Sequence, residues 1–235
     1  MFIKKTPLIL LTIILISACA TKNSNGRKHA KINPANKYYS FESSGNILSD
    51  LSAIELPPES SEDFNLSGLT YQASGKYQKA ITAYNKAAKL NPTDASVFNN
   101  RGIAYNSSGQ YTRAIADYNK AIKLNPDGGA VYNNRGYSYV LRRKYDEALS
   151  DFNHAIELNP KIAVAYNHRG LIYANSQSQI YSAILDFSKA IELKPDAPEA
   201  YYNRAIAYKN FGSKALACQD FKAACDLGNC KEVCY

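Results

Sequence analysis

The feature that most constrains this chain is a proline-ended phrase that occurs four times. The phrase reads AAKLNP at 87–92, AIKLNP at 121–126, AIELNP at 155–160 and AIELKP at 190–195. The spacings between the four prolines are 34, 34 and 35 residues. Because proline cannot continue a helix, each copy ends a helical stretch. A fixed period of this length predicts helical hairpins stacked in tandem.

Five units share one pattern of small and aromatic residues. They begin at Ser61, Ala95, Gly129, Ala163 and Pro198, and the fourth unit carries one inserted residue. Position 4 is Phe or Tyr, position 8 is Gly or Ala, and position 11 is Tyr in every unit. Further along, positions 20 and 27 are always Ala, and position 24 is Tyr or Phe. Positions 4, 8 and 11 form one face of a first helix (helix A), and the small residues let a second helix (helix B) cross it closely.

This pattern resembles the tetratricopeptide repeat, and the resemblance covers most of the chain after residue 60. It implies an all-α fold, a right-handed α-solenoid of about five helix hairpins within residues 61–227, followed by a short C-terminal cap at 228–235. The expected units are 61–94, 95–128, 129–162, 163–197 and 198–227.

A second regularity couples the two helices of a unit. Position 7 is Arg and position 23 is Asp in units two to five, whereas unit one has Ser67 and Ala83. Removing one partner of a partly buried ion pair is costly, so the joint loss predicts an Arg–Asp pair across the helix interface. The arginine row is therefore interpreted as structural rather than as a binding row.

Residues 1–18 have the layout of an export signal. Two lysines precede a short apolar stretch, and small residues then lead to Cys19. The apolar run is shorter than the roughly 20 residues that a membrane span needs, which disfavours a transmembrane anchor. The tetrad ISAC at 16–19 resembles the bacterial lipobox, whose cysteine receives diacylglycerol, so Cys19 is the predicted lipidation site. Plain cleavage of a secretory signal is the alternative.

Residues 19–60 lack periodicity and are rich in Ser, Asn, Lys and Pro, which predicts a flexible, lipid-anchored tether. The first part of the tether is basic and the second part is acidic. The basic part is interpreted either as a contact with anionic lipid headgroups or as ordinary solvated linker charge. Ala20 rather than Asp follows the cysteine, so the lipoprotein resemblance implies the outer membrane, with the protein facing the periplasm.

The tetratricopeptide family receives peptides or partner helices in a concave groove lined by helix A, and positions 5 and 6 belong to that groove. Here both positions are rich in Asn, a mediocre helix former, so helix stability does not explain the row at exposed positions. Amide groups suit an extended peptide backbone without demanding a particular sequence. The expected partner-binding residues are Asn65, Asn99, Asn100, Asn133, Asn134, Tyr137, Asn167, His168, Tyr202 and Asn203. The alternative is repeat duplication that copied a tolerated NNRG string.

Four cysteines cluster at the C-terminus, at Cys218, Cys225, Cys230 and Cys234. An even count in an exported chain favours disulfides, with three possible connectivities. Cys218 and Cys225 are too far apart along one helix to bridge each other, so pairing with the last two cysteines would staple a terminal cap. Small buried thiols are the alternative. The spacings contain no CxxC or Cys/His set, so no metal site is predicted.

Composition and motifs narrow the function classes. The net charge is +8, but the basic residues are scattered along the sequence without the basic and aromatic signature of nucleic-acid binding. No nucleophile motif, phosphate loop or carboxylate pair is visible. We therefore expect no enzyme activity, no cofactor and no small-molecule substrate.

The expected function is that of a membrane-anchored adaptor that binds protein partners in its groove. The resemblance to tetratricopeptide lipoproteins implies a role in cell-envelope assembly, either in organising peptidoglycan hydrolases or in type IV pilus and secretin biogenesis. A surface-exposed or secreted protein that binds host proteins is the alternative.

Overall fold

The computed structural model describes residues 60–230. The predictions for the signal peptide, Cys19, the tether up to residue 59 and Cys234 fall outside these residues. By its internal contacts the chain divides into residues 1–57 and 58–235, and all the helices described here lie in the second unit.

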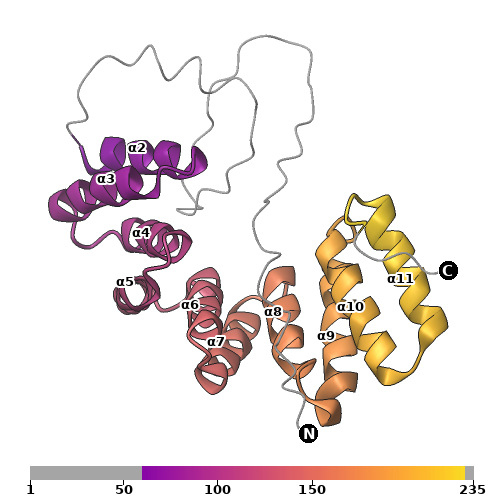
Figure 1. Cartoon of the computed structure of the whole chain (residues 1–235). Helices are drawn as coiled ribbons and strands as arrows, with labels where there is room; N and C mark the ends of the chain where they lie inside the picture. The colour runs from indigo at the N-terminus through magenta and orange to yellow at the C-terminus, as the bar shows by residue number, and fades with distance from the viewer. Residues whose placement is uncertain (1–59, 231–235) are drawn as a thin grey trace, which may run out of the picture. The chain divides into compact units, whose positions relative to one another are not determined.

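Ten α-helices follow one another as five hairpins, and residues 60–230 contain no strand (Figure 1). The hairpins are α2 (Ser61–Ala73) with α3 (Tyr77–Leu90), α4 (Ala95–Ser107) with α5 (Tyr111–Leu124), α6 (Gly129–Leu141) with α7 (Tyr145–Leu158), α8 (Ala163–Tyr173) with α9 (Ile180–Leu193), and α10 (Pro198–Phe211) with α11 (Lys214–Asp226). The inserted residue of the fourth repeat lies in a turn that contains the 3₁₀ helix η2 (Gln177–Gln179). The predicted all-α fold of tandem hairpins is confirmed.

Short local signals start and stop these helices. At the start of α2, the Ser60 hydroxyl accepts from the Asp63 backbone N–H at 3.1 Å, and the Asp63 carboxylate accepts from the Ser60 N–H at 3.2 Å. This capping box satisfies two backbone donors that the first helical turn would otherwise leave unpaired. The C-caps of α3, α5, α7 and α9 are Asn91, Asn125, Asn159 and Lys194. Each cap directly precedes the proline of the repeated phrase, as the sequence predicts.

The turn from helix A to helix B uses a left-handed residue in four repeats. Gly occupies that place in repeats one, two and five, whereas repeat three has Arg143 there with φ +60°. A side chain in this conformation is strained, because its Cβ approaches the backbone. The basic turn of repeat three is therefore held at a local conformational cost that the glycine turns avoid.

In each of the first four hairpins, an aromatic ring of helix B packs against the glycine at position 8 of helix A. A Cβ added to Gly102 would lie 2.6 Å from Cε1 of Tyr118, and the other three glycines at position 8 are equally close to their ring. These rings are fully buried, so a side chain added at position 8 of these four repeats would force the ring to shift. In the fifth repeat Ala205 replaces the glycine and packs beside Phe221.

Neighbouring repeats are joined by apolar residues from helix B of one unit and helix A of the next. Ile81 and Ala88 of α3 belong to the same buried cluster as Val97 and Ala104 of α4. These are positions 21 and 28 of the first unit and positions 3 and 10 of the second. Because no hairpin covers this surface by itself, the stacking of repeats makes one continuous core.

Candidate functional site: the ladder face

The asparagine row forms hydrogen bonds from each repeat to the next. The position 6 amide of one repeat donates from Nδ2 to Oδ1 of the position 5 amide of the repeat before it. The distances are 3.1 Å for Asn100 to Asn65, 3.0 Å for Asn134 to Asn99 and 3.0 Å for Asn203 to Asn167. We call this series the amide ladder. Successive A helices α2, α4, α6 and α8 contact one another, which brings the partners within reach.

The ladder corrects one expectation from the sequence. Position 5 was expected to be exposed, but Asn65, Asn99 and Asn133 are only 5%, 8% and 6% exposed. A buried amide needs partners, and the next repeat supplies one. The asparagines therefore join the repeats to one another, which explains why a mediocre helix former is kept in mid-helix. Whether the same residues also bind a partner stays a prediction.

The ladder leaves part of each amide unused. Among residues 60–230, Nδ2 of the position 5 asparagines and Oδ1 of the position 6 asparagines have no hydrogen-bond partner within the protein. None of these atoms is a fully buried orphan, because the only such atom in residues 60–230 is the Tyr118 hydroxyl. Each rung made of two asparagines therefore offers at least one donor and one acceptor to solvent or to a ligand.

The third rung is a histidine instead of an asparagine. His168 Nδ1 lies 3.0 Å from Asn133 Oδ1, so the ring donates to the amide oxygen when Nδ1 carries the proton. The ring stacks on Tyr137 with centroids 5.1 Å apart and also contacts Phe152 at 5.4 Å. This burial lowers the pKa of His168 to about 4, so the side chain is neutral at pH 7.

The two tyrosines expected to anchor a ligand are both half-buried. Tyr137 lies against His168, and burial raises its pKa, with a further contribution from Tyr111. Tyr202 packs edge-on against Phe221 at 5.6 Å, which places part of its ring in the fifth hairpin. Tyr137 therefore lies beside the amide ladder, whereas the Tyr202 ring also packs against the core of the fifth hairpin.

Sequence reasoning missed an apolar row beside the amides. Position 9 of every helix A is apolar or aromatic and half-buried: Leu69, Ile103, Tyr137, Leu171 and Ile206. Leu66 at position 6 of the first repeat is 47% exposed. The recurrence of an apolar residue at position 9 was visible in the sequence. We call positions 5, 6 and 9 of the five A helices the ladder face.

The predicted Arg–Asp pairs are confirmed in repeats two to five. Arg101 binds both oxygens of Asp117 at 2.7 Å, and the other three arginines do the same with their aspartates at 2.6–2.8 Å. The hydrogen bond to the buried aspartate raises the pKa of each arginine. The aspartates neutralise the arginines at position 7, so these arginines join the two helices of their hairpins.

Each arginine also reaches back to the preceding repeat. Arg101 Nη1 donates to Asn85 Oδ1 at 2.9 Å, and Arg204 Nη1 donates to the Ser188 hydroxyl at 3.0 Å. Asn or Ser occupies this position 25 in repeats one to four, but repeat five, which has no following arginine, carries Lys222. That difference was a readable signal for a contact between repeats.

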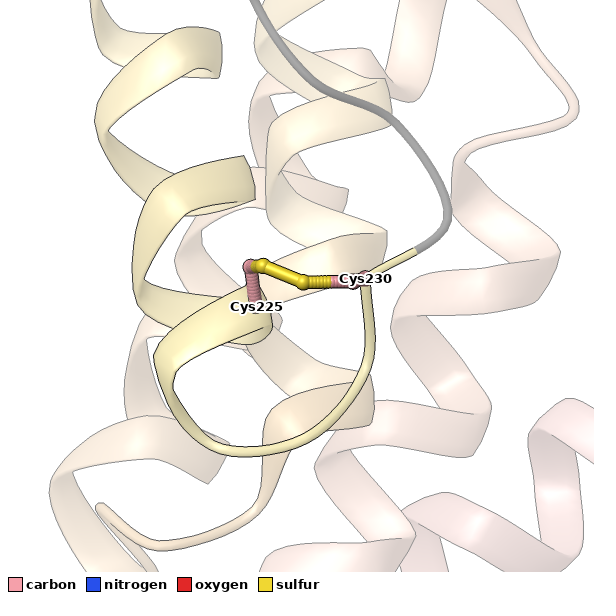
Figure 2. Close-up of a disulfide and its surroundings, with 2 residues drawn as sticks. All are labelled: Cys225 and Cys230. Atoms are coloured by element: carbon pink, nitrogen blue, oxygen red, sulfur yellow. A yellow bond between two sulfur atoms is a disulfide. The ribbon is translucent and has the colours of Figure 1, made fainter.

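A disulfide pairs Cys225, in the last turn of α11, with Cys230 in the segment that follows the helix (Figure 2). Gly228, with φ +98°, turns the chain between them, and the Asn229 N–H donates to the Ala224 carbonyl at 2.8 Å. Cys218 is also disulfide-bonded. Cys234 lies outside the described residues.

No group of His, Cys, Asp and Glu side chains in residues 60–230 could hold a metal ion. Among the same residues, no helix combines the length and hydrophobicity needed to cross a bilayer.

Three family models match the chain. A "TPR repeat" model matches residues 68–107 and 175–212, a "Tetratricopeptide repeat" model matches 95–127 and 129–162, and a second model of that description matches 198–227. Together these matches cover more than half of the chain. No curated protein sequence matches it.

Several solved structures are similar. MamA is 28% identical with a TM-score of 0.59, over 68% of this chain and 93% of that one. PilF from Pseudomonas aeruginosa is 20% identical with a TM-score of 0.66, over 72% and 76% of the two chains. YrrB, titled a TPR protein with an unusual peptide-binding site, is 22% identical with a TM-score of 0.55, over 76% and 91%. At these low identities, the last two likenesses show the fold alone. With its five hairpins, its buried Gly–ring contacts and the matched models, the chain is a tetratricopeptide-repeat protein.

Proposed function

We propose that the chain is a non-enzymatic adaptor, attached to a bacterial membrane by lipid on Cys19, which binds an extended segment of a partner protein on its ladder face. Tetratricopeptide repeats serve in general as non-catalytic scaffolds for protein–protein interaction. The observation that carries the proposal is the row of half-used amides beside the apolar row at position 9.

The amides favour an extended ligand over a helical one. A peptide in extended conformation presents free N–H and C=O groups along its length, which match the free acceptor and donor groups of each rung. A helix satisfies its own backbone groups and would leave the amides unpaired. The apolar residues at position 9 would then receive side chains of the ligand.

The ladder face selects against charged ligands. Positions 5, 6 and 9 carry no Asp, Glu, Lys or Arg in any repeat, and His168 is neutral at pH 7. An uncharged surface gives no compensation for burying a charged side chain. The preferred segment therefore combines extended backbone with uncharged, partly apolar side chains.

The lipid anchor and the location are part of the same proposal. The lipobox-like tetrad that ends at Cys19 and the linker-like composition of residues 20–60 support an exported protein held at the outer membrane and facing the periplasm. The resulting role is in envelope assembly, either in organising peptidoglycan hydrolases or in pilus and secretin biogenesis.

Photo-crosslinking from the two sides of the hairpin tests the binding surface. A crosslinking amino acid is placed at Ile103 on the ladder face, and in the matched control at Thr112, an exposed residue of α5. We expect Ile103 to capture a discrete protein product in living cells and Thr112 to capture none of it. The same product from both positions, or from Thr112 alone, would overturn the assignment of the ladder face.

A charge substitution gives the quantitative counterpart. Ile103→Glu should weaken binding of the captured partner at least about tenfold, because an unpaired carboxylate is buried under the ligand. Thr112→Glu adds the same charge away from the ladder face and should leave binding unchanged. Thermal unfolding of both variants separates loss of binding from loss of fold.

The anchor is tested by Cys19→Ser in the full chain. The wild-type protein should incorporate a labelled fatty acid and remain with membranes after washing, whereas the variant should do neither. Protease added to intact cells tests the side of the membrane. Cleavage of the wild-type protein in intact cells would exclude the periplasmic location and favour the host-binding alternative.

A further inference from the structure

The B helices of the first two repeats carry six exposed cations. They occupy positions 19, 26 and 29 of each helix: Lys79, Lys86 and Lys89 on α3, and Arg113, Lys120 and Lys123 on α5. At 100° per residue these positions fall within an arc of about 80°, so each helix presents its three cations on one side. The ion pairs within residues 60–230 use none of the six. We call these residues the basic face.

Four of the six cations lie over aromatic rings of the adjoining A helix. Lys86 lies 5.0 Å from the ring centroid of Phe64, and Lys120 lies 4.1 Å from that of Phe98. Lys79 and Arg113 hold the corresponding places over Tyr71 and Tyr105, each at 5.9 Å. The rings attract the cations and hold the long side chains in place beside the helix pair.

The two helices contribute to one continuous surface. Asn85, the neighbour of Lys86, accepts a hydrogen bond from Arg101 at 2.9 Å. Arg101 in turn lies 5.3 Å from the Phe98 ring, which also carries Lys120. Arg101 itself is neutralised by Asp117. The charge along the sequence looks scattered, but the fold gathers it.

The same positions change character in the later repeats. Repeat three has Glu147, His154 and Glu157 at positions 19, 26 and 29. Repeat four has Ser182, Lys189 and Glu192 at these positions, and the last two pair with each other at 2.6 Å. One side of the solenoid is therefore strongly basic in its first two repeats and weakly acidic in the next two.

We propose that the basic face lies on the anionic phospholipid headgroups of the membrane that holds the lipid anchor. This inference rests on the proposed function, because the anchor brings the first repeat near the bilayer. In the sequence, only residues 20–60 separate Cys19 from the first repeat. The cations occur in the two repeats closest to that connection.

A second copy of the chain fits the basic face less well. The acidic half of the same side offers little free charge, because Lys144 pairs with Glu147 and Lys189 pairs with Glu192. A lipid leaflet instead presents many fixed anions to all six cations at once. The ladder face stays available, because position 9 of helix A lies about 150° around the helix from positions 4 and 11, which carry the rings under the cations.

The test uses the full lipidated chain on two kinds of vesicle. One kind is phosphatidylcholine alone, and in the other about a third of the lipid is phosphatidylglycerol. Flotation with the neutral vesicles reports the anchor. The rate at which an amine-reactive reagent modifies each lysine, read by mass spectrometry, reports the basic face. Lys161 and Lys194, which are exposed in later repeats, serve as internal references.

We expect Lys86 and Lys120 to react at least about fivefold more slowly on the anionic vesicles, since a lysine near such a surface is worth about that factor in partitioning. High salt should restore the rates, and the reference lysines should not change. Equal modification rates on both kinds of vesicle would overturn the proposal. It would also be overturned if the slower modification depended on the amount of bound protein or on added DNA instead of on anionic lipid.

Two variants that lose the same number of lysines but keep the lipid anchor separate the effect of the basic face from that of the anchor. Replacing Lys79, Lys86, Lys120 and Lys123 by Gln should lower the amount of protein that anionic vesicles retain through salt washes by at least about tenfold. Replacing Lys161, Lys194, Lys214 and Lys222 by Gln removes the same charge and should have no such effect. A wild-type chain that fails to float with neutral vesicles but is retained by anionic ones would refute the lipid anchor and support the basic face.

Discussion

The two ends of the solenoid are closed in different ways. In α2 the residues that would face a preceding repeat are polar. Asp63 stands where later repeats have a buried Val or Ala, and Ser67 stands where they have a paired Arg. Thr70 stands where they have mostly small or apolar residues. In α11 the residues that would face a following repeat are Cys218 and Cys225, where the earlier B helices have Ala, Ile or Leu. The first end presents polar side chains, whereas the second is closed covalently.

The difference teaches how a repeat protein terminates. A polar substitution lets water replace the missing neighbour, and its cost is small because few atoms are buried. A cysteine keeps a small apolar surface and ties the chain beyond the helix onto it, which makes the last hairpin depend on an oxidising compartment. Variants that convert one kind of junction into another, or that weaken one end alone, separate the contributions of the two closures.

The largest effect should come from breaking an ion pair at an interior junction. Arg135→Ser leaves the Asp151 carboxylate buried and unpaired, which should lower the free energy of unfolding by about 3 kcal/mol. Adding Asp151→Ala reproduces the Ser and Ala combination of repeat one and should recover about half of that loss. Urea unfolding followed by circular dichroism measures both. If the double variant is no more stable than the single one, the two residues are not coupled.

The next effect belongs to the third rung and depends on pH. The pKa of His168 is lowered to about 4 in the fold, so the unfolded chain binds the proton more tightly. The stabilisation is fully present above the unfolded pKa of about 6.5 and is lost as the pH falls toward 4, by up to about 3 kcal/mol. His168→Asn copies the neighbouring rungs and should remove most of this pH dependence while keeping stability at pH 7. Thermal melts between pH 7 and pH 4 compare the two proteins, and parallel curves would contradict the assignment to His168.

A third prediction weakens only the C-terminal end. Cys225→Ser opens a loop of a few residues, which should cost the last hairpin about 2 kcal/mol. Hydrogen exchange should then be faster in α11 and unchanged in α2 and α3. A reductant added to the wild-type protein should reproduce this pattern. Equal acceleration at both ends would show that the disulfide acts on the whole domain.

Much of this architecture was predictable from the sequence, because it depends on regular spacing. The repeated phrase, the Gly–ring positions and the joint presence of Arg and Asp each recur at a fixed interval, and each has the contact that the spacing predicts. The asparagine row was visible in the sequence but its burial was not, since a repeating amide looks the same whether it faces solvent or the next repeat. That difference depends on the rotation between successive hairpins, which no local pattern encodes.

The basic face shows the opposite case. Lys86 and Lys120 are 34 residues apart in the sequence and look unrelated, yet they share a position in the repeat. Reading charge by repeat position rather than along the chain would have exposed the contrast with Glu147 and Glu157. The partner of each arginine in the preceding repeat, such as Asn85, was missed for the same reason, although Asn or Ser recurs at position 25 of the first four repeats.

The smallest effect should come from the N-terminal end, where the hydrogen bonds of the capping box begin α2. Ser60→Ala removes the hydroxyl of the capping box and should cost α2 about 1 kcal/mol. Ser107→Ala, at an exposed position near the end of α4, is the matched control and should have little effect. Hydrogen exchange should accelerate in α2 while α11 keeps its protection, with or without reductant, which is the reverse of the pattern expected for Cys225→Ser. If Ser60→Ala instead accelerates hydrogen exchange in α11 as much as in α2, the five repeats unfold as one unit. The two ends then do not have separate stabilities.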